Sequence, residues 1–175
     1  NPFDSQDMNA AIEALGANLK SGWELGLQME VPVVGSVWQI VICGMGGSAI
    51  GGDFTTAYLS DKMPIPVLAH RNYGLPGWAK GPETLVICSS HSGNTEETLS
   101  SFNEALRRGC SLMSICTGGK LAELSRINGK TCWIFDHVGQ PRTAIGWTVG
   151  LLLALFFRLD LIEDQSTAVE EAALI

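Results

Sequence analysis

The sequence predicts an α/β fold, a three-layer sandwich of the flavodoxin-like type with a five-stranded parallel sheet and helices on both faces. Five short runs are apolar throughout, as expected of strands that are buried on both faces. Segments with apolar residues at helical spacing alternate with these runs, and right-handed crossovers turn such a pattern into a doubly wound sheet. A glycine-rich turn follows the first run and a serine-rich turn follows the third, which are places where ligands bind in such folds.

The elements can be placed in chain order from this periodicity. A leading amphipathic helix is expected at 7–27, with Met8, Ile12, Leu15, Leu19 and Trp23 on one face. The strands are expected at 37–43, 65–69, 84–89, 111–116 and 131–135. The other helices are expected at 48–59, 95–107, 121–124, 143–161 and 167–175. Residues 1–175 are therefore expected to form one domain, with a leading helix within 1–30 and a core at 36–162. Residues 163–175 are expected to begin a connection to a second domain.

Composition limits the classes of partner. The chain has 175 residues, which suits one domain with a proper core, and 46% of them are hydrophobic, which is typical of a folded protein with a buried sheet. The formal net charge of −7 predicts binding of neither nucleic acid nor anionic membrane, because both need a basic surface. A negative chain can still bind phosphate, since backbone amides and helix N-termini supply local positive potential.

No membrane anchor or signal peptide is expected. The longest apolar run, 144–157, is shorter than the roughly 20 residues that span a bilayer, and the first residues are polar and acidic. Gly146 and Gly150 form a GxxxG pattern, which membrane dimers use, but a buried packing helix with close backbone approach is the favoured interpretation.

The cysteines predict a redox compartment. There are five, without a CxxC pair or metal-site spacing: Cys43, Cys88, Cys110, Cys116 and Cys132. This pattern favours reduced, buried thiols in a cytoplasmic protein. A catalytic cysteine is the weaker alternative, since none lies in a polar, electropositive context.

The first motif, GMGGSAIGGD at 44–53, directly follows the first strand. Glycines let a backbone approach a ligand closely, Ser48 can cap the next helix, and the free amides of that helix can face an anion. A dinucleotide fingerprint fits poorly because Ala49 stands at its third glycine, although that substitution alone does not exclude NAD. A P-loop is excluded because no GxxxxGK[ST] sequence occurs.

The second motif, SSHSGNTEET at 89–98, follows the third strand. The hydroxyls of Ser90, Ser92 and Thr95 at the start of a helix suit a phosphate, which has several oxygens to satisfy. Ordinary N-capping by Asn94 or Thr95 is the alternative. A cap explains one such residue but not the cluster, so phosphate binding is favoured.

The third motif, GQPRT at 139–143, lies between the fifth strand and the long helix. Arg142 is placed to stabilise negative charge on a reacting oxygen. The alternative is a surface arginine, although the helix dipole disfavours a cation at this end.

These motifs, together with TGGKLAEL at 117–124, resemble the N-terminal sugar isomerase (SIS) domain of the bifunctional phosphoglucose/phosphomannose isomerases. The leading segment FDSQDMNAAIEALGANLKSGWELG is similar to the first helix of that family, so the resemblance covers essentially the whole chain.

The resemblance implies binding of a phosphorylated hexose and interconversion of glucose 6-phosphate or mannose 6-phosphate with fructose 6-phosphate, without cofactor or metal. Arg142 is implied to stabilise the enediolate formed as a proton moves between C1 and C2. The residues implied to surround the 6-phosphate are Gly46, Gly47, Ser48, Ser90, Ser92 and Thr95. His91 stands where the family often has tyrosine, and no catalytic role is assigned to it, to His70 or to His137.

The resemblance also implies that part of the active site is missing. In the family, the carboxylate base and the ring-opening histidine come from a second SIS domain, and the matching stretches do not occur here. Glu96 and Glu97 start a helix that faces the phosphate, not the sugar carbons. We therefore expect the phosphate-binding half of the enzyme, inactive alone, with a second SIS domain and a homodimer as partners.

Two alternatives from other classes stay open. One is a complete phosphosugar-sensing domain of a regulator, without chemistry. The other is a nucleotide-binding module, which is disfavoured because His70-Arg71-Asn72, and no acidic residue, follows the second strand. The preference between glucose and mannose is not determined by the sequence.

Overall fold

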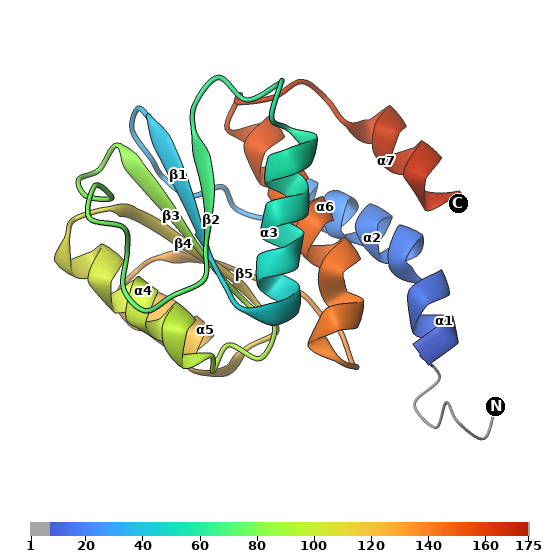
Figure 1. Cartoon of the computed structure of the whole chain (residues 1–175), viewed down its shortest axis with the longest axis horizontal. Coiled ribbons are helices and arrows are strands. Elements are labelled where there is room, and N and C mark those ends of the chain that lie inside the picture. The colour runs from blue at the N-terminus through green and yellow to red at the C-terminus, as the bar shows by residue number, and fades with distance from the viewer. Residues whose placement is uncertain (1–7, 175) are drawn as a thin grey trace.

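The five predicted strands form one parallel sheet in the order β2-β1-β3-β4-β5 (Figure 1). The computed structural model describes residues 8–174. The strands are β1 (Gln39–Cys43), β2 (Val67–His70), β3 (Thr84–Ser90), β4 (Ser111–Cys116) and β5 (Thr131–Ile134). From β1 the chain crosses outward to β2 and then returns to β3 on the other side of β1. The direction of winding therefore reverses between β1 and β3, and this confirms the predicted doubly wound α/β class.

Helices cover both faces of the sheet (Figure 1). One face carries α4 (Glu96–Arg107) and α5 (Gly119–Ile127). The other carries α2 (Leu15–Gln28), α3 (Gly46–Tyr58) and α6 (Ile145–Arg158), with α7 (Ser166–Ala173) packed against α2. The predicted three layers are thus present.

Several helix boundaries differ from prediction. The leading helix is divided at Ala14 into α1 (Met8–Glu13) and α2, and residue 7 lies outside the described part of the chain. The predicted helix 121–124 is longer, and the helix expected at 143–161 begins as a 3₁₀ turn, η1 (Pro141–Ala144), with proline in its first turn. The last helix begins at Ser166, and residue 175 is outside the described part.

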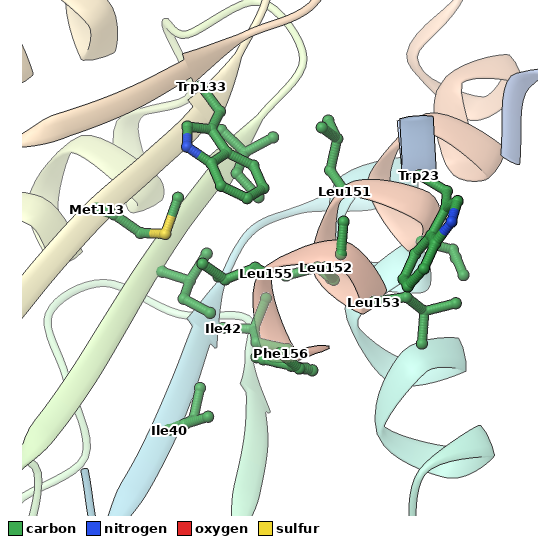
Figure 2. Close-up of a cluster of buried hydrophobic side chains, with 14 of the residues drawn as sticks. Trp23, Ile40, Ile42, Met113, Trp133, Leu151, Leu152, Leu153, Leu155 and Phe156 are labelled. Carbon is green, nitrogen blue, oxygen red and sulfur yellow. The ribbon is translucent and has the colours of Figure 1, made fainter. Parts of the chain in front are cut away.

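Strand alternation divides the core into two clusters. Ile40 and Ile42 of β1 face α2 and α6, while Val41 and Cys43 face α4. Figure 2 shows the larger cluster, in which side chains from the sheet meet those of α2 and α6. The labelled side chains are Trp23, Ile40, Ile42, Met113, Trp133, Leu151, Leu152, Leu153, Leu155 and Phe156. Because successive strand residues point to opposite faces, β1, β3, β4 and β5 contribute to both clusters, whereas the edge strand β2 adds Val67 to the larger one.

Glycines allow α6 to lie directly against the backbone of α2. A Cβ added at Gly150 would lie 2.2 Å from the carbonyl oxygen of Leu19, and one at Gly146 would lie 2.4 Å from that of Leu15. The favoured interpretation of the GxxxG pattern, a buried packing helix with close backbone approach, is therefore confirmed. Within residues 8–174, no helix has the length and apolar character needed to cross a membrane.

All five cysteines are unbridged, as predicted, and four of them are buried, whereas Cys132 is half-buried. Burial raises the pKa of the Cys88 thiol well above its ordinary value, with Cys43 adding to the effect. That environment suits a packing residue and not a nucleophile.

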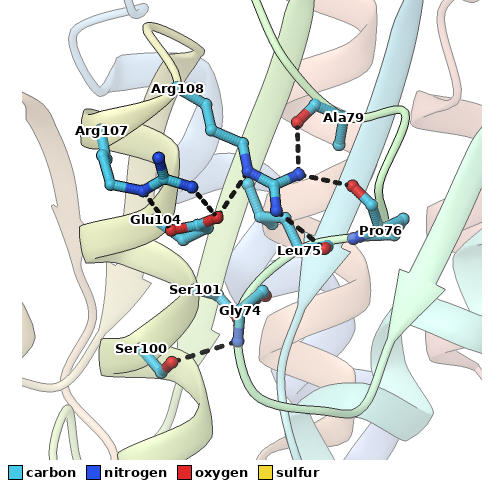
Figure 3. Close-up of polar contacts among 9 residues, drawn as sticks. All are labelled: Gly74, Leu75, Pro76, Ala79, Ser100, Ser101, Glu104, Arg107 and Arg108. Atoms are coloured by element: carbon cyan, nitrogen blue, oxygen red, sulfur yellow. Dashed lines mark hydrogen bonds and ion pairs between the residues drawn. The ribbon is translucent and has the colours of Figure 1, made fainter.

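The segment after β2 is fixed to the end of α4 by Arg108 (Figure 3). The Arg108 Nε donates to Glu104 at 2.6 Å. The guanidinium also donates to the carbonyl oxygens of Pro76, Ala79 and Leu75, at 2.7, 3.0 and 3.4 Å. Arg107 and Arg108 together lower the pKa of Glu104 to about 2 through hydrogen bonds to its carboxylate.

Candidate functional site: an oxyanion site at the carboxyl edge of the sheet

The three sequence motifs meet beyond the carboxyl ends of β1 and β3. We call them the glycine turn (residues 44–48), the serine loop (residues 89–95) and the arginine turn (residues 139–144). Cys43 and Cys88 are partners in the β1–β3 register, so the glycine turn and the serine loop leave the sheet side by side. The backbone N–H of His91 donates to Ser48 Oγ at 3.2 Å and links the two. The site thus lies at the reversal of strand order, where ligands of doubly wound folds bind.

Hydroxyl groups gather within the serine loop. Ser90 Oγ and Thr95 Oγ1 are 2.9 Å apart, and the N–H of Gly93 donates to Ser90 Oγ at 3.1 Å. Ser92 is exposed, and its Oγ accepts from the N–H of Asn94 at 3.2 Å. Thr95 occupies the N-cap position of α4 without a side-chain capping bond. Capping therefore does not account for this hydroxyl, which faces Ser90 instead.

The serine loop is supported by the turn that follows β4. Gly93 has φ +67°, and a Cβ on it would lie 1.8 Å from the carbonyl oxygen of Gly118. The N–H of Leu121 donates to the Gly93 carbonyl at 2.9 Å, and the N–H of Lys120 donates to Asn94 Oδ1 at 3.1 Å. These contacts give the TGGK sequence its local role and require glycine at position 93.

A glycine also lets the arginine turn reach the glycine turn. A Cβ on Gly47 would lie 2.5 Å from the carbonyl oxygen of Pro141 and 3.1 Å from Arg142 Cα. Arg142 is exposed, and it stands beside the first turn of α3. Gly46, with φ +50°, is exposed where α3 begins.

The predicted capping role of Ser48 is wrong. Helix α3 begins at Gly46, two residues earlier than expected, and its N-cap is Met45, which has no side-chain capping bond. Ser48 therefore lies inside the first turn, is buried, and accepts the hydrogen bond from the His91 backbone. Ser48 therefore joins the glycine turn to the serine loop and does not cap the helix.

The electrostatics of this edge favour an anion. Helices α3 and α4 lie on opposite faces of the sheet and both begin here, and helix N-termini carry partial positive charge and unbonded N–H groups. The Glu96 carboxylate is engaged by Tyr73, whose Oη donates to Glu96 Oε2 at 3.2 Å. The negative charge of Glu97 is the main cause of the raised pKa of Tyr73. Amides, hydroxyls and one exposed guanidinium make a site suited to an oxyanion with several oxygens.

Sequence reasoning missed a pair of histidines beside the site. His91 Nε2 lies 2.9 Å from His137 Nδ1, and His137 Nε2 lies 3.3 Å from Thr143 Oγ1. Burial lowers the pKa of His91, and the nearby His137 lowers it further. Burial also lowers the pKa of His137, against the opposing charge of Asp136. The only available signal was that each histidine lies in or next to a motif.

The described residues do not meet the requirements of a metal site, and a cavity lies next to the histidine pair. In residues 8–174, no group of three or more His, Cys, Asp or Glu side chains is arranged to hold a metal ion. Beyond His137, a cavity of about 530 Å³ opens between α1 and the arginine turn, lined in part by Ala11, Asn18 and Gln140.

Comparisons with known proteins agree with this fold. No family model matches the chain. The structure of tagatose-6-phosphate ketose/aldose isomerase from Escherichia coli has a TM-score of 0.53 and 18% identity, covering 93% of this chain and 47% of that one. The Vibrio vulnificus NanR protein, solved in complex with ManNAc-6P, has a TM-score of 0.58 and 17% identity, covering 97% of this chain and 68% of that one. The chain thus has the fold of the sugar isomerase class.

A relative closer in sequence defines the family. Over 169 residues the chain is 38% identical to the bifunctional phosphoglucose/phosphomannose isomerase of Caldicellulosiruptor bescii, and the match covers 96% of this chain. The chain belongs to the bifunctional phosphoglucose/phosphomannose isomerase family, which confirms the resemblance. It spans half the length of this relative.

Proposed function

We propose that this chain binds the phosphate of a hexose 6-phosphate and forms the phosphate-binding half of an aldose–ketose isomerase. The reaction proposed for the whole enzyme converts glucose 6-phosphate or mannose 6-phosphate into fructose 6-phosphate. The observation that carries the proposal is the cluster of hydroxyls in the serine loop, held against the glycine turn at the reversal of strand order. The family membership of the chain supports the choice of reaction.

The phosphate is proposed to lie against the two loops. Ser90 and Thr95, which now hydrogen-bond to each other, would turn their O–H groups toward phosphate oxygens, and Ser92 and Ser48 would add two more donors. The backbone amides of Gly46 and Gly47 lie at the start of α3, where the helix dipole favours the negative charge.

Arg142 is proposed to act on the sugar carbons. In aldose–ketose isomerisation a base removes the proton from C2 of the aldose, an enediolate forms, and a proton returns to C1 of the ketose. A guanidinium at the edge of the site stabilises the negative oxygen of the enediolate more strongly than the neutral carbonyl. We assign no base within this chain, since Glu96, the first residue of α4, accepts a hydrogen bond from Tyr73 of the segment after β2.

A second domain of the same fold is proposed to supply the base, and a homodimer is proposed as the assembly. The relative from Caldicellulosiruptor bescii is twice as long as the part that this chain matches. The α3 helix, which begins in the site, exposes Ile50, Phe54 and Tyr58 at a spacing of four residues, and such a stripe suits a domain contact. The five unbridged thiols support a cytoplasmic location for this enzyme.

The alternative is a sensing domain that binds a phosphosugar without chemistry. The observation in its favour is that the NanR protein, solved with ManNAc-6P, shares the fold. That likeness is one of fold alone at 17% identity, whereas the 38% identity to an isomerase favours the enzyme.

The proposal is tested by thermal unfolding with and without glucose 6-phosphate. We expect the sugar phosphate to raise the Tm of the chain, and Ser92→Ala to abolish the rise. Ser60→Ala, at an exposed serine after α3, is the matched control and should keep the rise. An unchanged rise in Ser92→Ala would refute the phosphate assignment. We also expect no interconversion of glucose 6-phosphate and fructose 6-phosphate by this chain alone, and robust turnover would show that the base is misplaced.

A further inference from the structure

We propose that His91 and His137 are positioning residues that hold the arginine turn, and with it Arg142, in place beside the serine loop. The proposal rests on the proposed function, in which Arg142 acts on the reacting carbons. It concerns two side chains whose sequence positions gave no reason to connect them.

A continuous series of hydrogen bonds joins the two segments. It runs from His91 in the serine loop to His137 at 2.9 Å, from His137 to Thr143 at 3.3 Å, and from Thr143 Oγ1 to the Gln140 carbonyl at 2.8 Å. Thr143 is the residue directly after Arg142, and it is buried. The histidine pair therefore connects the proposed phosphate ligands to the backbone that carries the guanidinium.

The direction of these bonds follows from the acceptor at their end. The Gln140 carbonyl can only accept, so the single hydroxyl proton of Thr143 is donated to it. His137 Nε2 must then carry the proton donated to Thr143, and in the neutral ring Nδ1 is left to accept from His91 Nε2. Neutral rings with these tautomers satisfy every bond in the series.

The surroundings of the pair keep both rings neutral and fixed. The His91 ring lies edge-on to Phe135 at 6.2 Å between centroids, and Phe135 stacks on Trp147 of α6 at 5.6 Å. Burial favours the neutral form of both rings, against the negative charge of Asp136 beside His137.

The arginine turn needs such a connection. It begins at Gly139, whose φ of +148° lies outside the range that other residues favour, and residues 135–140 form no regular structure. Pro141 packs against Gly47 of the glycine turn, and Asn18 Nδ2 donates to the Thr143 carbonyl at 3.4 Å. The histidine series adds the link from this turn to the serine loop. Without the link, Arg142 would keep its charge but lose its defined place.

Two substitutions at one position separate the hydrogen bond from ring packing. His91→Phe keeps an aromatic ring against Phe135 and removes the donor, whereas His91→Gln keeps an N–H donor at about the position of Nε2. Two ligands separate Arg142 from the phosphate site. Inorganic phosphate tests the serine loop alone, and a five-carbon aldonate 5-phosphate carries a planar carboxylate that imitates the enediolate.

We expect His91→Phe to weaken binding of the aldonate phosphate about tenfold, equivalent to about 1.4 kcal/mol. Binding of inorganic phosphate should weaken less than about twofold. His91→Gln should bind both ligands within about twofold of the unsubstituted chain. In an Arg142→Ala background, His91→Phe should have no further effect, because the histidine acts through that arginine. Equal affinities in all variants, or additive losses, would overturn the proposal.

A readout without ligand completes the test. The N–H of Thr143 donates to the Gln140 carbonyl at 2.9 Å, and its hydrogen exchange should be faster in His91→Phe but not in His91→Gln. Identical exchange in the three proteins would refute the positioning role even if no ligand bound. A chain that binds neither ligand but shows the exchange difference would instead contradict the proposed function alone.

Discussion

The close contact between the serine loop and the turn after β4 predicts a large and specific effect of Gly93→Ala. The position has φ +67°, and the new Cβ would lie 1.8 Å from the Gly118 carbonyl oxygen, so the two segments must separate by more than 1 Å. Such a separation breaks the Leu121-to-Gly93 hydrogen bond at 2.9 Å and the Lys120-to-Asn94 bond at 3.1 Å.

The expected cost can be divided between backbone and contact. A left-handed alanine costs about 1 kcal/mol, and two lost hydrogen bonds cost about 1 kcal/mol each, which gives a total of about 3 kcal/mol. Gly109→Ala is the matched control, because Gly109 also has φ +67° but no atom within 4 Å of the added Cβ. That variant should lose only about 1 kcal/mol.

The assay is urea unfolding followed by tryptophan fluorescence, with the same chains tested for a Tm rise in glucose 6-phosphate. We expect Gly93→Ala to lose about 2 kcal/mol more of its unfolding free energy than Gly109→Ala, and to lose the Tm rise as well. Equal destabilisation by the two substitutions would show that the loop contact is not the source of the effect.

Three further outcomes are expected. Arg108→Ala should lower the free energy of unfolding in urea by about 2 kcal/mol, since three carbonyls lose their charged donor (Figure 3). Arg107→Ala, at a side chain that is 70% exposed, should change this free energy little. Similar losses in the two variants would contradict the role of Arg108. The pKa values of His91 and His137 are lowered from 6.5 in the folded state, so their contribution to stability is complete above pH 6.5 and is lost as pH falls through the lowered values. The urea midpoint should therefore decrease as the pH is lowered from 7 to 5, and it should decrease less in a His91→Gln/His137→Asn protein. An equal decrease in the unsubstituted and the doubly substituted protein would show that the two histidines are not its cause. Gly150→Val should prevent α6 from packing on α2 and give an expanded chain in size-exclusion chromatography. A native elution volume would contradict the need for close backbone contact at this position.

The sheet was predictable because its three central strands, β1, β3 and β4, are buried on both faces and so are mainly apolar, as in Leu85 to Cys88. The position of the site was predictable because the glycine turn and the serine loop each directly follow a strand. The start of α3 was misplaced because glycine is a poor helix former, although at Gly47 the close approach of Pro141 requires a residue without a Cβ. The link from His91 to His137 could not be predicted, since 46 residues separate the two and only the tertiary fold brings them together.

The glycine contact between α2 and α6 also has a consequence for the order of folding. Contacts between these helices join residues as far as 132 positions apart, such as Arg158 and Gly26, and so enclose the whole sheet in one loop. Closing so long a loop has an entropic cost that local pairs avoid, and folding slows as such distant contacts become more important. We therefore expect α2, although it precedes every strand of the sheet in the chain, to be among the last elements to acquire its native contacts.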